Sequence, residues 1–299
     1  MQKRIIFFIL VCTSFIAAHQ LHAGAWTLKK RQLWVKSTFL VQQTSDRYAS
    51  INIVCGDATC RNGQKTPYFF NGKIETSAII FDLWYGLTDH IELRFQLPYY
   101  DIAFKDEVNP ERPSTNDIGD IRFAARYRLP FDPIVTTLRI GAKAPTGFFN
   151  KDSEVVPIGD GQWDLEIGAE FGRSFWPIPA YANLMLQYRF RFEPDLETTN
   201  LDPGDELEFR AEAGVTVYKN IGVKALLEGF WGQEFTALSE NSNFQLSNSE
   251  RRILYFRPGI WGTFFKSLEY EFSVRFSLSG KNFPAGQIFM TGLSYTFDL

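Results

Sequence analysis

An alternating stretch at residues 163–171, WDLEIGAEF, decides the fold. Apolar residues stand at every second position, and acidic residues or glycine stand between them. Successive side chains of an extended strand point to opposite faces, so one face of this stretch is apolar and the other is polar. We therefore interpret it as a β-strand that separates an apolar environment from a polar one.

The same period-two pattern recurs along the chain, for example at 207–217 (LEFRAEAGVTV) and at 270–278 (YEFSVRFSL). It predicts about twelve strands. Most of them exceed the usual strand length of about 5–6 residues and reach the roughly 9–11 residues with which a tilted strand crosses a bilayer. The predicted strands lie at residues 31–43, 74–86, 90–104, 118–130, 134–146, 162–174, 180–193, 205–218, 221–235, 251–265, 268–279 and 287–298.

The connections between these strands alternate in length. Tight connections lie at 87–89, 130–133, 175–179, 219–220 and 266–267. Long connections lie at 44–73, 105–117, 147–161, 194–204 and 236–250, and the last one, 280–284, is intermediate. Outer-membrane barrels have short periplasmic turns and longer outer loops. The sequence therefore predicts an all-β protein, a transmembrane antiparallel β-barrel of about twelve strands with both chain ends in the periplasm.

A soluble β-sandwich is the alternative, because it also has alternating strands joined by turns. The length of the strands and the alternation of the loops count against it. Aromatic residues gather near the strand ends, as in the interfacial girdles of membrane barrels. These aromatic residues are Trp84-Tyr85, Tyr99-Tyr100, Phe175-Trp176, Trp261 with Phe264-Phe265, and Tyr295 with Phe297.

The N-terminus has the layout of a secretory signal peptide. A basic start, Met1-Gln2-Lys3-Arg4, precedes an apolar run at 5–18, and small residues follow at Ala23-Gly24-Ala25. We expect removal of residues 1–25 and a barrel over 26–299, with cleavage after Ala23 as the alternative. The apolar run is short for a membrane anchor of about 20 residues. Export together with the predicted membrane barrel implies the outer membrane of a Gram-negative type of cell.

Processing leaves little material for enzyme chemistry. Of three histidines only His90 remains, at a predicted turn, so a general base for hydrolysis is missing and no catalytic residue is predicted. Cys55 and Cys60 remain as a close pair in an oxidising compartment, which favours a disulfide over a two-thiolate metal site. We expect no metal, no cofactor and, with a net charge of -3, no nucleic-acid partner.

The final strand ends LSYTFDL at 293–299, with an apolar residue at every second position. This resembles the C-terminal strand that the barrel-assembly machinery recognises in outer-membrane proteins. A final Leu299 replaces the usual aromatic residue, and Phe297 stands two positions before it. The expected partners are therefore the lipid bilayer and the assembly machinery.

If the apolar face meets lipid, the polar face lines a charged lumen. Acidic residues of the sixth predicted strand then lie between basic neighbours, which favours cross-strand ion pairs. Such pairs either fill a narrow barrel or line a polar pore, and we leave both open. The candidate lumen and constriction residues are Arg122, Arg126, Arg128, Arg139, Lys143, Asp164, Glu166, Glu170, Arg189, Arg191, Glu208, Arg210 and Glu212. Further charges predicted on this face are Glu92, Arg94, Asp120, Lys224, Glu228, Arg257, Glu271 and Arg275.

The basic members of the candidate set are the predicted attraction site for anionic or phenolate-like solutes. They are Arg122, Arg126, Arg128, Arg139, Lys143, Arg189 and Arg191.

Residues 117–193 carry a set of short motifs: DIGD at 117–120, RYRL at 126–129, KAPTG at 143–147, GDG at 159–161 and WDL at 163–165. With Asn183 and the YRF of 188–190, they resemble the outer-membrane transporter family linked to meta-pathway phenol degradation. The resemblance implies a barrel that passes small, often aromatic compounds, and it implies no catalytic residues. Asp117 stands where a glycine is expected.

Together these observations predict a channel for passive uptake of small solutes, with hydrophobic or aromatic compounds implied by the resemblance alone. The alternative is a structural or surface-interaction barrel with a plugged lumen.

Overall fold

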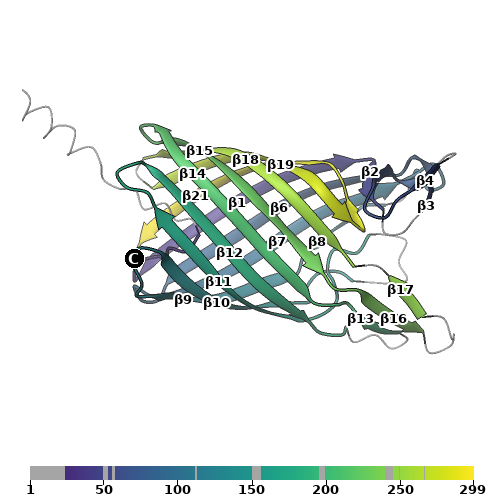
Figure 1. Ribbon diagram of the computed structural model, residues 1–299, viewed down its shortest axis with the longest axis horizontal. Helices are drawn as coiled ribbons and strands as arrows, with labels where there is room; N and C mark the ends of the chain where they lie inside the picture. Colours follow the sequence, from purple (N-terminus) through teal and green to yellow (C-terminus); the bar gives the residue numbers. More distant parts are fainter. Residues whose placement is uncertain are drawn as a thin grey trace, which may run out of the picture.

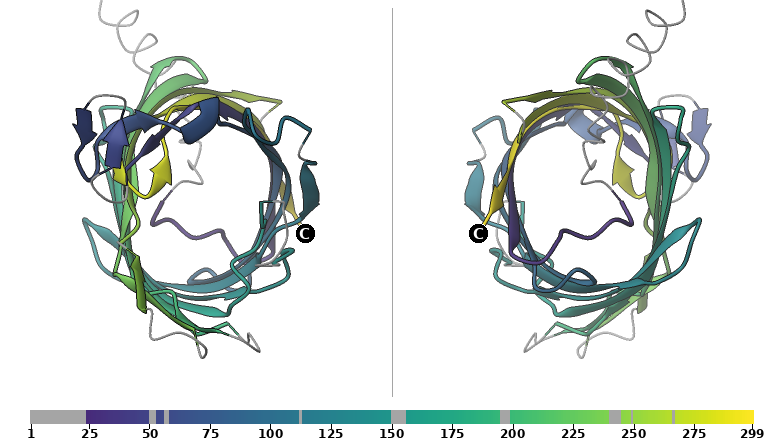
Figure 2. Two further views of the ribbon diagram at one scale, coloured as in Figure 1. Left: turned by 90° about the vertical axis from the view of Figure 1, so that its right-hand side faces the viewer. Right: turned by 90° about the vertical axis from the view of Figure 1, so that its left-hand side faces the viewer.

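The chain forms one closed, antiparallel barrel of twelve strands (Figure 1). The computed structural model describes residues 24–49, 53–55, 58–111, 113–149, 156–194, 199–239, 245–248, 250–265 and 267–299. Each barrel strand pairs with the next one along the chain, and the first strand also pairs with the last, which closes the ring seen end-on in Figure 2. The strands are β1 (Gln32–Thr44), β6 (Lys73–Gly86), β7 (Ile91–Lys105), β9 (Ile121–Leu129), β10 (Val135–Ala144), β11 (Asp164–Ser174), β12 (Ala180–Arg191), β14 (Glu206–Tyr218), β15 (Ile221–Gly232), β18 (Arg252–Phe264), β19 (Leu268–Lys281) and β21 (Gln287–Asp298).

Each predicted strand overlaps one of these barrel strands, so the predicted fold class is confirmed. The differences lie in the connections, which carry short strands of their own. Near Cys55 and Cys60 the chain adds β2 (Asp46–Tyr48), β3 (Ile53–Cys55), β4 (Ala58–Cys60), β5 (Lys65–Pro67) and a short 3-10 helix at Phe69–Asn71. Elsewhere it adds β8 (Thr115–Ile118), β13 (Thr199–Asp202), β16 (Phe235–Ser239), β17 (Gln245–Asn248) and β20 (Phe283–Pro284).

The two ends of the barrel differ. Tight connections at 87–90, 130–134, 175–179, 219–220 and 265–267 lie at one end, which we call the turn end. The C-terminal residue meets the start of β1 there, because the N–H of Leu299 donates to the carbonyl of Arg31, and that of Arg31 donates to the carbonyl of Gly86. The longer connections and their short strands lie at the opposite end, the loop end (Figure 1).

The burial pattern is the reverse of that in a soluble protein. The largest fully buried side chains include Arg126, Lys143, Glu92 and Glu166, whereas the outward face carries exposed apolar residues such as Leu186 and Ile167. Charged side chains are almost never fully buried unless they are paired. The polar face of each strand therefore points into the barrel and the apolar face points out, as the alternation predicts. In the part of the chain that the structure describes, no helix is long and apolar enough to cross a membrane.

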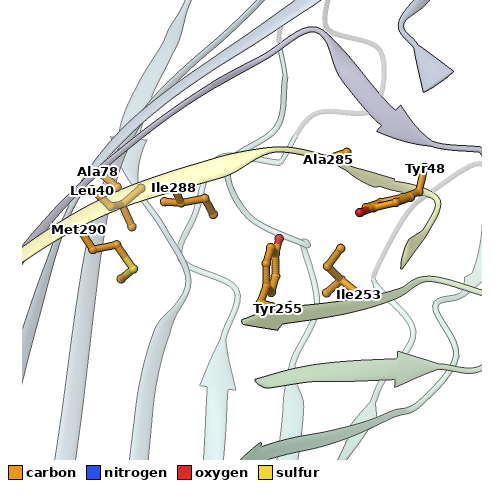
Figure 3. Packing of buried hydrophobic residues seen from close by; sticks show 8 residues of the cluster. All are labelled: Leu40, Tyr48, Ala78, Ile253, Tyr255, Ala285, Ile288 and Met290. Carbon is orange, nitrogen blue, oxygen red and sulfur yellow. The ribbon is translucent and has the colours of Figure 1, made fainter. Parts of the chain in front are cut away.

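One apolar cluster interrupts the polar interior near the loop end (Figure 3). It consists of inward residues of β1, β6, β18 and β21, together with side chains from the connections that carry β2 and β20. Its members are Leu40, Tyr48, Ala78, Ile253, Tyr255, Ala285, Ile288 and Met290. The lumen is thus amphipathic, charged over most of its wall and apolar at this place.

Candidate functional site

The central ion-pair ladder of the lumen is built around Glu166 of β11. The β11–β12 register sets Glu166 opposite Arg189, and β10 and β9 contribute two more guanidinium groups. An oxygen of the fully buried Glu166 lies 2.8 Å from Arg122, 3.0 Å from Arg139 and 3.4 Å from Arg189. The structure thus brings the acidic strand and its basic neighbours together, as cross-strand pairing favours.

Arg189 extends this ladder to the next strands. Its guanidinium lies 2.7 Å from Glu206 and also contacts Glu208, both on β14. Arg191 lies 3.4 Å from Glu206 and 3.6 Å from Asp160. Cations and carboxylates therefore alternate across this wall of the lumen, and each arginine of the wall has a carboxylate partner.

Near the turn end, Arg126 forms a separate buried group with two carboxylates. Its two terminal nitrogens lie 2.7 Å from Glu92 and 2.5 Å from Glu170, and the Arg126 side chain has no exposed surface. Arg94 lies 2.7 Å from the same Glu92, and its guanidinium carbon is 3.6 Å from the centroid of the Trp84 ring. Arg128 lies apart from this group, because it donates to the carbonyl of Asp89 in a turn.

Lys143 joins the motifs of the family resemblance into one cluster near the loop end. Its ammonium lies 3.0 Å from Asp120, 2.7 Å from Asp160 and 3.2 Å from Asp164. The carboxylate of Asp120 accepts the backbone N–H groups of Gly147 and of Asp160. The DIGD, KAPTG and GDG motifs, which are apart in the sequence, therefore meet around one lysine.

Asp160 belongs to a connection, outside the barrel strands. Burial disfavours its charged form, but Lys143, Arg251 and Arg191 outweigh this effect and hold the pKa of the Asp160 carboxyl well below its usual range. The carboxylate is therefore ionised at neutral pH. Its side chain is still 39% exposed, so this ion pair is open to solvent on one side.

The adjoining part of the wall, formed by β14, β15, β18 and β19, has a different ratio of cations to carboxylates. Glu228 of β15 is shared by three arginines, at 3.1 Å from Arg210, 3.4 Å from Arg257 and 2.8 Å from Arg275. Among the candidate residues on this side, Arg210 therefore shares its partner, and Glu212 accepts a hydrogen bond from Tyr181 at 2.6 Å.

Next to this group, Glu271 of β19 is shared by two lysines, at 2.9 Å from Lys36 and 3.0 Å from Lys224.

A central cavity of about 430 Å³ lies between these walls, and all twelve barrel strands contribute lining residues. Trp34, Trp84 and Trp261 are among them. The ring centroids of Trp34 and Trp84 are 4.0 Å apart. The expectation that Trp84 and Trp261 belong to an outer aromatic girdle is therefore wrong. Because neighbouring residues of a strand face opposite ways, only one member of such an aromatic pair can face lipid.

The segment before β1, residues 24–31, enters the lumen from the turn end, as the purple trace inside the ring of Figure 2 shows. Its backbone binds inward side chains of four strands. Arg126 donates to the carbonyl of Gly24 at 2.5 Å, Thr137 donates to that of Ala25, and Glu92 accepts the N–H of Leu28 at 2.8 Å. The N–H of Ala25 also donates to Asn183, at 3.4 Å. The alternation rule gave no sign of this segment, because it is not a strand.

Cys55 and Cys60 lie on the paired strands β3 and β4. Cys60 is opposite Ile53, and Cys55 is opposite Ala58, so the two cysteines are diagonal neighbours in this register. Diagonal side chains stand farther apart than the roughly 3.5–4.5 Å between Cβ atoms that a disulfide needs. Their side chains lie outside the described part of the chain, and the disulfide stays a prediction.

Solved structures with a similar arrangement are outer-membrane barrels. The COG4313 outer-membrane channel from Pseudomonas putida F1 superimposes with a TM-score of 0.73 and 16% identity, over 91% of this chain and 98% of that one. The transport unit of the autotransporter AIDA-I from Escherichia coli gives a TM-score of 0.51 and 12% identity, over 95% and 97% of the two chains. The chain has the outer-membrane barrel fold. At these identities, the likeness of the barrel to both proteins concerns the fold alone.

No protein-family model matches the chain, and no curated protein matches it either. The link of the barrel to phenol degradation therefore stays a prediction, and so does a constriction at the Arg-rich cluster.

Proposed function

We propose that the chain is an outer-membrane channel for the passive uptake of small solutes. The observation that carries this proposal is the central cavity, to which all twelve strands contribute. The exposed apolar residues of the outer face support a position in the lipid bilayer. The turn end then faces the periplasm and the loop end faces the exterior.

The final strand supports delivery by the barrel-assembly machinery. Leu293, Tyr295, Phe297 and Leu299 alternate along it, and all four are more than a third exposed on the outer face of the barrel or at its end. We propose that the assembly machinery recognises this alternating apolar face.

Aromatic or other hydrophobic solutes are the favoured cargo. The sequence resemblance points to them, and the three tryptophans of the cavity wall offer apolar, polarisable surfaces for them. The charged walls disfavour a lumen that passes only hydrocarbons, so we propose solutes that carry both an apolar and a polar part.

Single-channel conductance of the refolded protein in a planar bilayer tests the proposal. Reproducible current steps are expected. Arg210→Glu changes a half-exposed charge on the cavity wall and should shift the ion selectivity toward cations. Arg128→Glu is the matched control, because Arg128, near the end of β9, binds a turn carbonyl and is not among the lining residues, so the ion selectivity of this variant should stay that of the wild type.

A surface-interaction barrel with a plugged lumen is the second candidate. The segment 24–31 favours it, because this segment occupies the lumen at the turn end. A protein that inserts as a barrel but gives no current steps, either intact or without residues 24–28, would support this candidate and contradict the channel.

A further inference from the structure

We infer that the central cavity binds an amphipathic monocarboxylate, with the carboxylate paired to Arg257 and Arg275 and the apolar body against the neighbouring apolar wall. This inference rests on the proposed function, since it names the class of solute that the lumen selects. Its evidence is the charge ratio at Glu228, the contacts of Arg257, and the position of both arginines beside the apolar cluster.

The number of carboxylates per cation differs between the ladder around Glu166 and the neighbouring groups around Glu228 and Glu271. The ladder around Glu166 offers several carboxylates to its arginines, but Arg210, Arg257 and Arg275 all form their ion pair with the same carboxylate, that of Glu228. The nearby Glu271 is shared by two lysines. In these two groups five cations therefore meet two carboxylates, which leaves positive charge at the cavity.

Besides Glu271, five carboxylates line the cavity: Asp82, Glu170, Glu208, Glu212 and Glu269. Three of them have partners other than Arg257 and Arg275, since Glu170 pairs with Arg126, Glu208 pairs with Arg189, and Asp82 accepts a hydrogen bond from Gln96. Glu212 binds the hydroxyl of Tyr181 on β12. Glu269 lies six residues from Arg275 along β19, which corresponds to roughly 20 Å at about 3.3 Å per residue.

The guanidinium N–H groups of Arg257 have few hydrogen-bond acceptors. Its side chain is 11% exposed, and its Nε is buried without a hydrogen-bond acceptor, 3.4 Å from Glu228. One terminal nitrogen donates to the thioether sulfur of Met290 at 3.7 Å, which is a weak acceptor. A carboxylate accepts two parallel N–H bonds from a guanidinium group, so a bound carboxylate would supply what this site lacks.

Both arginines lie against the apolar cluster of Figure 3. Met290, the sulfur partner of Arg257, belongs to this cluster, and the guanidinium carbon of Arg275 is 5.1 Å from the ring centroid of its Tyr255. Met290 and Ile80 also line the cavity. A ligand that pairs with the arginines therefore has an apolar surface next to its charged group. A cavity of about 430 Å³ is within the range that encloses a small organic ligand.

Calorimetry with the refolded full-length protein in a neutral detergent tests the inference. The probes are 4-phenylbutyrate, its uncharged amide, and butyrate, which has the same charge without the ring. We expect 4-phenylbutyrate to bind at least tenfold more tightly than either comparison compound. This comparison uses the wild-type protein and stays decisive if a variant fails to fold.

The double variant Arg257→Gln/Arg275→Gln should lose at least tenfold in affinity for 4-phenylbutyrate, whereas Glu228 keeps Arg210 as a partner. Arg173→Gln is the control, because Arg173 is an exposed arginine near the turn end of β11 and does not line the cavity. Its substitution should leave the affinity unchanged.

Equal binding of acid and amide, or full binding by a folded double variant, would overturn the inference. Current steps recorded on the same preparation separate this failure from that of the proposed function. A protein that conducts but does not prefer the acid remains a channel with another solute. One that binds the acid but never conducts keeps the binding site and loses the transport role.

Discussion

The ammonium of Lys143 lies 2.7 Å from an oxygen of Asp160, so a connection at the loop end is fastened to an inward residue of β10. Asp120 reinforces this link, since its carboxylate accepts the N–H of Asp160 and also contacts Lys143. These contacts hold both ends of the connection between β10 and β11 against the inner wall of the barrel at its loop end.

Replacing Asp160 by Asn should weaken this link in a pH-dependent way. Because the pKa of Asp160 is lowered in the folded protein, its charge adds stability above the unfolded carboxyl pKa of about 3.9, and this stability is lost as the pH falls through the lower folded value. The free energy of unfolding should drop by less than about 1 kcal/mol at pH 7 and pH 5, since the group is partly exposed. The difference should vanish only in stronger acid. Urea titrations measure it, with Glu111→Gln in an exposed loop as the control.

Replacing Arg126 by Gln should be far more harmful. It leaves the buried Glu92 and Glu170 with Arg94 as their remaining cation, at 2.7 Å and 3.9 Å, and the loss of a partner from a buried ion pair typically costs about 3–5 kcal/mol. Unfolding in urea, followed by tryptophan fluorescence, measures the change. Arg128→Gln, two positions along the same strand, should stay within about 0.5 kcal/mol of the wild type. Similar losses in the free energy of unfolding at both positions would show that the ion pairs of Arg126 make no special contribution to the stability of the barrel.

Leu186→Arg tests the lipid-facing surface. Leu186 lies in the middle of β12, and 44% of it is exposed on the outer face. An arginine near the bilayer midplane costs a barrel about 2–4 kcal/mol. This cost should appear in unfolding experiments in phospholipid vesicles. Val108→Arg, in a loop where Val108 is 61% exposed, should cost almost nothing. If Leu186→Arg were equally harmless, the outer face would not contact lipid.

The mass of the mature protein tests where the signal peptide ends. Cleavage after Ala25 would remove the carbonyl groups of Gly24 and Ala25, which bind Arg126 and Thr137 inside the lumen. We therefore expect cleavage after Ala23, so that Gly24 is the first residue. Intact-mass spectrometry of protein purified from membranes distinguishes the two ends. A chain that starts at Trp26 would contradict this expectation.

The barrel could be predicted from the sequence because its main signal is local. The period-two alternation of a strand such as β11 depends only on neighbouring residues, and the order of the strands follows from their connections. The ladder at Glu166 was predictable for the same reason, since β10 and β12 must flank β11. Neighbours in the sequence became neighbours in the sheet.

Contacts across the lumen were not predictable in this way. Trp84 shares a strand face with Asp82, so the alternation could have assigned it to the lumen, but its contact with Trp34 follows only from the register with β1. Around Glu228, Arg210 is the direct cross-strand partner and Arg257 lies on the other neighbouring strand, but Arg275 comes from β19, two strands away. The lumen position of residues 24–31 depends on side chains of β7, β9, β10 and β12, and no local pattern in the segment indicates it.

That segment also sets an order of events during folding. Ala25 binds Thr137 and Asn183, which follow it by 112 and 158 residues along the chain. These partners take up their positions only once β10 and β12 have joined the sheet. Closing so large a loop is slow compared with pairing adjacent strands, because the chain entropy must be given up before the contact forms. The residues that are synthesised early therefore reach their final places late, and their docking reports that the strands from β7 to β12 are in position.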